Sequence, residues 1–76
     1  MNKYHFYGFF HPYGLQGYDI PIEQEYFVEA ISLEQAYFFL AKRLLREYPS
    51  WNETISEKQL YSILRKSKSL YCRKVT

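Results

Sequence analysis

The residues Tyr26–Ala36, Tyr-Phe-Val-Glu-Ala-Ile-Ser-Leu-Glu-Gln-Ala, join a segment of alternating side chains directly to the start of a helix. The alternation predicts a strand over residues 23–31, with the apolar face that includes Tyr26 turned inward. Ser32 follows in the position of a helix N-cap, and Gln35 stands three residues later, where it completes a capping box. A strand that runs straight into a helix is typical of small α+β domains.

The same kinds of signal predict the other elements on either side of this junction. Aromatic side chains predict a strand near the N-terminus. A second capping pair, Ser56 with Gln59, predicts a second helix, and Pro49 ends the first. The predicted elements are a strand at 3–10, a loop at 11–21, a strand at 23–31, a helix at 33–48, a turn at 49–54, a helix at 57–67 and an edge strand at 70–75.

The order β-β-α-α-β favours a two-layer architecture. A pair of helices on one face of a small sheet buries the apolar side of each element at once. We therefore expect a mainly antiparallel three-stranded sheet with two helices packed on one face. With 76 residues the chain is predicted to form one compact domain, residues 1–76.

Aromatic residues make up 21% of the sequence, with nine Tyr, six Phe and one Trp. A core of this size holds only part of them, so we expect some rings on the surface, where they contact a partner. If both helices cover the same face of the sheet, the opposite face is open. The rings expected there are Tyr7, Phe9, Phe27 and Tyr71, with His5 and Arg73 near them. In the alternative, the 11–21 loop covers this face and makes a second small core.

Phe38 and Phe39 are adjacent on the first predicted helix, and two neighbours do not share one narrow helical stripe. We expect one of them to meet a partner or a second subunit. The wide apolar arc of the same helix also favours a homodimer.

Charge is distributed unevenly around a formal net charge of +2. Residues 1–40 contain one base and five acids, whereas residues 41–76 contain nine bases and three acids. The basic residues nearest the C-terminus are Arg65, Lys66, Lys68, Arg73 and Lys74. This set is predicted to contact nucleic acid or an acidic partner. In the alternative, its members on the last strand protect a sheet edge from further pairing.

The sequence contains no motif for a cofactor, a metal ion or a nucleophile. Cys72 is the single cysteine, so an internal disulfide is excluded and a structural zinc site is not expected. His5 and His11 are the conventional proton-transfer groups near neutral pH. No apolar run reaches the length of a membrane span, and the first residues do not resemble a secretion signal, so we expect a cytoplasmic protein.

Three hypotheses about function follow. The first is a small non-enzymatic protein-binding module that acts by occlusion or scaffolding, for example an inhibitor of a host defence complex encoded by a phage or mobile element. The second is a DNA- or RNA-binding protein that uses the aromatic sheet face and the basic C-terminal segment. The third is a minimal nuclease or toxin that uses His5 or His11.

Overall fold

Three strands and two α-helices make up the described part of the chain. The computed structural model describes residues 1–10, 20–53 and 55–75, and within them all side chains except those of residues 9, 10, 20–25, 50 and 52. The elements are β1 (Asn2–Phe10), β2 (Ile20–Ala30), α1 (Leu33–Glu47), the 3-10 helix η1 (Pro49–Glu53), α2 (Glu57–Lys66) and β3 (Leu70–Lys74). This order confirms the predicted α+β class.

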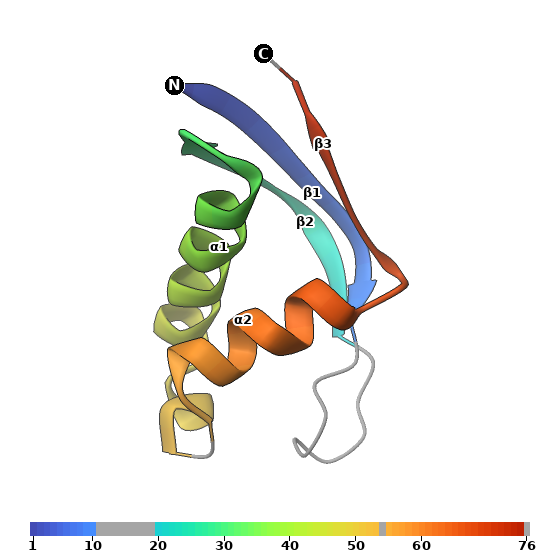
Figure 1. Cartoon of the computed structure of the whole chain (residues 1–76). Coiled ribbons are helices and arrows are strands. Elements are labelled where there is room, and N and C mark those ends of the chain that lie inside the picture. The colour runs from blue at the N-terminus through green and yellow to red at the C-terminus, as the bar shows by residue number, and fades with distance from the viewer. Residues whose placement is uncertain (11–19, 54, 76) are drawn as a thin grey trace.

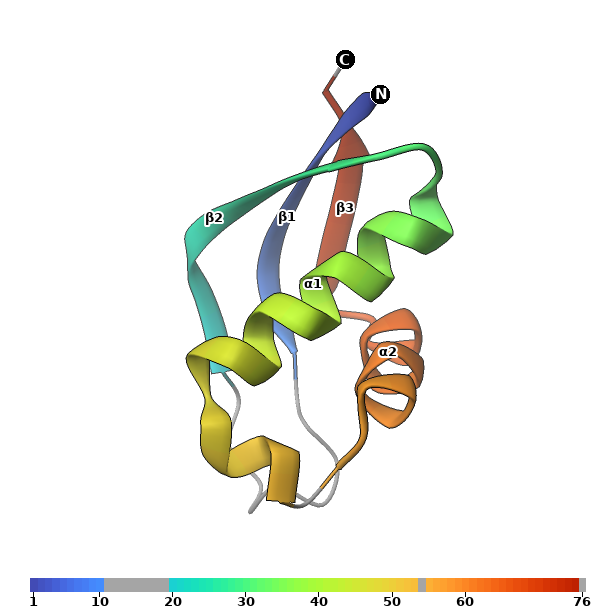
Figure 2. The ribbon, with the colours of Figure 1, turned by 90° about the vertical axis from the view of Figure 1, so that its left-hand side faces the viewer.

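The sheet has the strand order β2-β1-β3, and both neighbours of β1 run antiparallel to it. In the central strand β1, Tyr4 lies opposite Val28 of β2 on one side and opposite Lys74 of β3 on the other. Figures 1 and 2 show the three strands side by side, with the start of β1 next to the end of β3. Aromatic side chains suit a pleated surface of this kind, which agrees with the Tyr- and Phe-rich β1 forming a strand.

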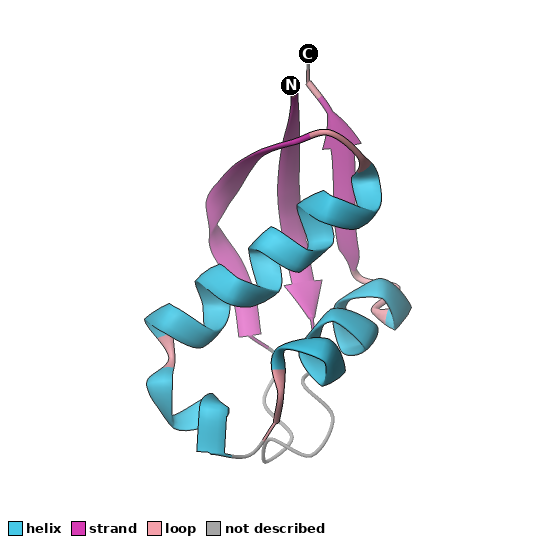
Figure 3. Ribbon diagram, turned by 60° about the vertical axis from the view of Figure 1, so that its left-hand side comes forward, coloured by secondary structure: helices cyan, strands magenta, loops and turns pink. Residues whose placement is uncertain are grey.

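Both helices lie on one face of the sheet, so the domain has two layers (Figure 3). Phe6 at the centre of β1 is fully buried, and its ring meets the ring of Tyr37 edge-on, with centroids 5.0 Å apart and planes at 84°. α1 also contacts α2 and η1, which accounts for its wide apolar arc. The buried apolar residues are Tyr4, Phe6, Tyr26, Val28, Ala30, Ala36, Leu40, Ala41, Leu44, Leu45, Trp51, Ile55, Leu60, Leu64 and Leu70. The inward direction predicted for the Tyr26 face is therefore confirmed.

Both helices begin at the predicted caps. In α2 the capping box is complete, because the Gln59 N–H donates to Ser56 Oγ at 3.2 Å and the Ser56 N–H donates to Gln59 Oε1 at 2.8 Å. In α1 the Gln35 N–H donates to Ser32 Oγ at 3.2 Å. The Gln35 side chain accepts from the N–H of Ile31, one residue before the cap, at 2.9 Å. Donors at both helix starts are thus satisfied by side chains.

A polar contact joins the end of α1 to β2. The Tyr26 hydroxyl donates to Glu47 Oε2 at 2.5 Å, and Arg43 Nε lies 3.5 Å from Glu47 Oε1. The Arg43 guanidinium also lies over the Tyr26 ring, 4.8 Å from its centroid. Burial and the adjacent carboxylate raise the pKa of Tyr26 above its ordinary value, so its hydroxyl stays a hydrogen-bond donor.

The predicted boundary between loop and second strand is wrong at residues 20–21. β2 begins at Ile20, which pairs with Phe10, and Pro21 pairs with Phe9. Because β2 is an edge strand, a residue without an N–H is tolerated there. Residues 11–19 of the predicted loop, and the prediction that it covers the open face, lie outside the described residues.

Two apolar residues at the ends of α1 are exposed. They are Leu33 at its first position and Tyr48 just after its last. Each lies at an end of the helix, and only the middle of α1 is covered by the sheet and α2.

Gly8 allows β1 to change register without breaking. The pairing with β2 shifts between Phe6 and Gly8, and Gly8 has a φ of +103°. This conformation is rare for any residue with a Cβ atom. A Cβ atom at this position would also lie 2.3 Å from the backbone oxygen of Ser69.

We expect Gly8→Ala to lower the free energy of unfolding by about 2 kcal/mol, because the positive φ and the contact with Ser69 are both unfavourable. Thermal unfolding followed by circular dichroism should then show a loss of roughly 10 °C in Tm. Lys58→Ala on the exposed side of α2 is the control and should change Tm little. An unchanged Tm for Gly8→Ala would contradict the left-handed conformation.

Candidate binding surface

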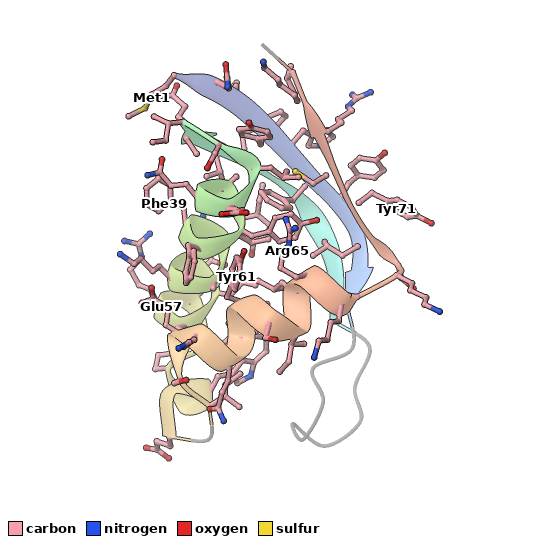
Figure 4. The ribbon with its side chains drawn as sticks, in the orientation of Figure 1. Met1, Phe39, Glu57, Tyr61, Arg65 and Tyr71 are labelled. Carbon is pink, nitrogen blue, oxygen red and sulfur yellow. The ribbon has the colours of Figure 1, made fainter. Side chains whose placement is uncertain are left out.

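The face of the sheet opposite the helices carries rings from all three strands. Because Tyr4 and Phe6 of β1 point into the core, the alternate residues of the sheet point away from it. We call this surface the open face and define it by Lys3, His5, Tyr7, Phe27, Glu29, Tyr71 and Arg73. Tyr7, Phe27 and Tyr71 are 37%, 45% and 54% exposed. In Figure 4, Tyr71 points from β3 away from both helices.

Four rings of the open face form one row across the strands. His5 lies opposite Phe27, and their ring centroids are 4.7 Å apart with planes at 10°. The next contact, between His5 and Tyr7, has centroids 5.1 Å apart and planes at 30°. Tyr7 lies opposite Tyr71, with centroids 5.4 Å apart and planes at 22°. The order of the row is therefore Phe27, His5, Tyr7, Tyr71.

The spacing of the rings shows how they stand on the sheet. Two rings lying side by side in one plane have centroids at least about 6 Å apart, because their edge atoms touch at roughly 3.5–4 Å. The pair formed by Phe27 and His5 is nearly parallel and closer than this, so the two rings overlap face to face. Because the facing surfaces of these two rings cover each other, the edges of the pair point toward solvent.

Two cations lie beside the row. Lys3 Nζ is 5.4 Å from the centroid of the Phe27 ring, and the Arg73 guanidinium is 6.0 Å from that of Tyr7. Positive charge over a ring face is attracted by the ring quadrupole. Glu29 is exposed and pairs with Lys3 across the strands, so it is the one carboxylate that the described side chains contribute to this face.

The sequence predicts His5 only near the rings of the open face. In the structure the His5 ring is a member of the row. It is only 5% exposed, because Phe27 and Tyr7 flank its ring. In this arrangement the imidazole is sheltered from a substrate that approaches through solvent. His11, the other histidine of the nuclease hypothesis, lies outside the described residues.

Of the remaining predicted aromatic residues, Phe38 and Phe39 belong to α1, and Phe9 belongs to β1. Phe38 stacks on Tyr61 of α2, with centroids 3.9 Å apart and planes at 5°, and remains partly exposed on the helical side. Phe39 packs against the core, and Lys42 Nζ lies 6.0 Å from its ring centroid. Phe9 belongs to β1, but its side chain lies outside the described residues.

The predicted basic set is divided between two faces. Arg73 lies on the open face, whereas Lys74, one residue further along β3, points to the helical side. Arg65 of α2 lies over Tyr37, with the guanidinium 4.9 Å from the ring centroid. Lys66 and Lys68 are exposed between α2 and β3. The set therefore surrounds β3 and does not form one flat patch.

The sequence signal for the open face was the alternation in the three strands, which predicted Tyr7 in β1, Phe27 in β2 and Tyr71 in β3. Lys3 was missed, although the same alternation in β1 places it two residues before His5. The position of His5 between two rings depends on cross-strand register, which no local pattern contains.

The fold and the open face define a small α+β domain with one aromatic sheet face outside its helical layer. No known family model, curated protein or solved structure matches the chain. Within residues 1–10, 20–53 and 55–75, none of the helices is both long and apolar enough to cross a membrane. The same residues contain no cluster of three or more His, Cys, Asp or Glu that could hold a metal ion.

Cys72 lies on the helical side of β3 and packs against the core. Burial raises the pKa of the Cys72 thiol to about 11, and the positive charge of Arg65 offsets only part of this effect. A thiol with this pKa is a poor nucleophile at neutral pH, since the thiolate is the reactive form.

We expect iodoacetamide to alkylate Cys72 about 100-fold more slowly at pH 8 than an ordinary protein thiol, because two pKa units remove that much thiolate. The rate, followed by mass spectrometry, should keep rising as the pH approaches 11. Unfolding in guanidinium should restore the ordinary rate. A plateau near pH 9 in the folded protein would show that the thiol is not shielded.

Proposed function

We propose that this protein is a small non-enzymatic binding module that holds a protein partner on its open face. The observation that supports the proposal best is the row of stacked rings, Phe27, His5, Tyr7 and Tyr71, which crosses three strands with large exposed portions. Three of these rings, Tyr7, Phe27 and Tyr71, are exposed, and aromatic side chains are enriched at protein interfaces. In this proposal the module acts by occlusion or scaffolding, as an inhibitor of a host system would.

The ring geometry favours protein over nucleic acid. Single-stranded bases bind to sheet proteins by stacking on ring faces. Here Phe27 and His5 cover each other's faces, and Lys3 and Arg73 lie over Phe27 and Tyr7. The Phe27–His5 pair thus presents ring edges, and ring edges and tyrosine hydroxyls suit the apolar side chains and backbone groups of a protein. Glu29 on the same face would also repel phosphates.

The dimensions of the domain limit the size of the contact. Its principal extents are 35 × 20 × 19 Å. A face within these limits buries no more than a standard interface, about 800 Å² per partner. Affinity then depends on a few aromatic anchors rather than on area. Tyr71 is the most exposed ring of the row, so it is the first candidate for such an anchor.

We expect the double substitution Phe27→Ser and Tyr71→Ser to weaken partner binding at least about tenfold, because both rings are anchors of the open face. The partner is isolated from the source cells by cross-linking, purified, and titrated calorimetrically against each variant. Tyr48→Ser is the matched control, since Tyr48 is similarly exposed but lies after α1. Circular dichroism confirms that both variants fold.

Three results would contradict the proposal. Equal affinity of the open-face variant and the Tyr48→Ser control would place the interface elsewhere. Binding of single-stranded oligonucleotides that is lost only in the open-face variant would support the nucleic-acid alternative instead. A dimer in sedimentation velocity that dissociates in the open-face variant would assign the face to a second copy of this chain.

A further inference from the structure

β3 offers a row of backbone groups that the sheet does not use. The Val75 N–H donates to the Lys3 carbonyl at 2.7 Å, and this contact continues the β1–β3 register. In an antiparallel ladder the hydrogen-bonded and non-bonded pairs alternate. Tyr71 and Arg73 are therefore bonded to β1, whereas the backbone groups of Cys72 and Lys74 point to the outer edge. Among the described elements, none lies beyond this edge (Figure 1).

Four cations surround the same edge on both sides of the sheet. Arg73 flanks it on the open face, and Lys74 and Arg65 flank it on the helical side. Lys68 lies in the turn that leads into β3. No carboxylate in the described part of the chain pairs with any of these four residues; the ion pair between Arg43 and Glu47 lies on α1. The edge thus combines unused backbone donors and acceptors with uncompensated positive charge.

We propose that β3 binds an acidic, extended segment of the partner protein as a fourth strand of the sheet. The inference rests on the proposed function in taking the partner to be a protein, and it adds the chemistry of the bound segment. Backbone hydrogen bonds to Cys72 and Lys74 hold the segment, and the cations select its charge.

Charge also explains why the occupant is not a second copy of β3. Two copies paired along this edge would bring the bases of both strands together, and like charges on neighbouring strands repel. Lysine and arginine protect an edge against self-association in this way. The same residues attract a strand of opposite charge.

The alternation of side chains along β3 predicts which types of residue the bound segment carries at each position. Arg73 and Lys74 are adjacent and point to opposite faces, so two consecutive acidic residues in the segment place one carboxylate beside each. The next two residues lie beside Cys72, which is half-buried, and Tyr71, which is an exposed ring. Cys72 packs against the core and Tyr71 offers an aromatic ring, so we infer an acidic pair followed or preceded by an apolar pair.

A peptide tests this inference without the natural partner. The probe is Thr-Val-Tyr-Glu-Glu-Val-Thr-Ser with capped ends and a fluorescent label, compared with a version in which both Glu are Lys. We expect the acidic peptide to bind, by anisotropy, with an affinity that falls with added salt. In ¹⁵N-labelled protein, amide exchange of Cys72 and Lys74 should slow on binding. Exchange of the Tyr71 and Arg73 amides, which already bond to β1, should change less.

Two controls separate strand addition from charge alone. N-methylation of alternate peptide residues removes the backbone donors on the peptide edge that pairs with β3. We expect this change to abolish binding. Arg73→Glu with Lys74→Glu should weaken binding at least about tenfold, whereas Lys42→Glu with Lys58→Glu, which makes the same change in net charge away from β3, should not. Both double variants are checked by circular dichroism.

Several outcomes would overturn the inference. They are equal binding of the Lys peptide, undiminished binding of the N-methylated peptide, and unchanged exchange of Cys72 and Lys74. Binding of oligo-dT with the same loss in the β3 variant would assign these cations to phosphates. Because Tyr71 also borders the edge of β3, the single substitution Phe27→Ser on β2 separates the two proposals. Loss of partner binding in that variant with no peptide binding would leave only the open face.

Discussion

The whole structure depends on β1 being hydrogen-bonded along both edges. Its two neighbours hold it in the centre of the sheet, so its alternating side chains are assigned to two opposite faces. Phe6 is buried under the helices, and His5 and Tyr7 are thereby placed on the opposite side. A slip of one residue would exchange the two sets and place Phe6 in solvent. The register that builds the core therefore also builds the open face.

Two helices, of 15 and 10 residues, form the only layer that the described chain places against the sheet. The rings of the other face consequently pack on one another. Each aromatic contact contributes about 0.5–1.5 kcal/mol beyond the area that it buries. The stacking of Phe27 on His5 holds both side chains in place before a partner binds. A surface ordered in advance loses little side-chain entropy on binding, which favours recognition by a small domain.

Local signals in the sequence were sufficient for the elements and for three rings of the open face. Ser32 and Ser56 cap the helices because their side chains bond to nearby amides, an interaction contained within four residues. Pro21 in β2 and the shift at Gly8 depend on pairing with a distant strand, and no local pattern contains that information. The burial of His5 has the same origin. Long-range register, rather than propensity, separates what could be predicted from what could not.

The open face and the edge of β3 would contribute differently to recognition. Contact between rings and an apolar surface is strong but weakly directional, so it leaves the orientation of a partner open. Backbone hydrogen bonds along an edge fix the orientation and register of a partner strand as well as holding it. Arg73 belongs to both surfaces, since it lies over Tyr7 and flanks the edge. A partner strand that pairs with β3 beside Arg73 would extend the sheet beneath the part of the partner that contacts Tyr71. The strand contact and the open-face contact would therefore each make the other more favourable.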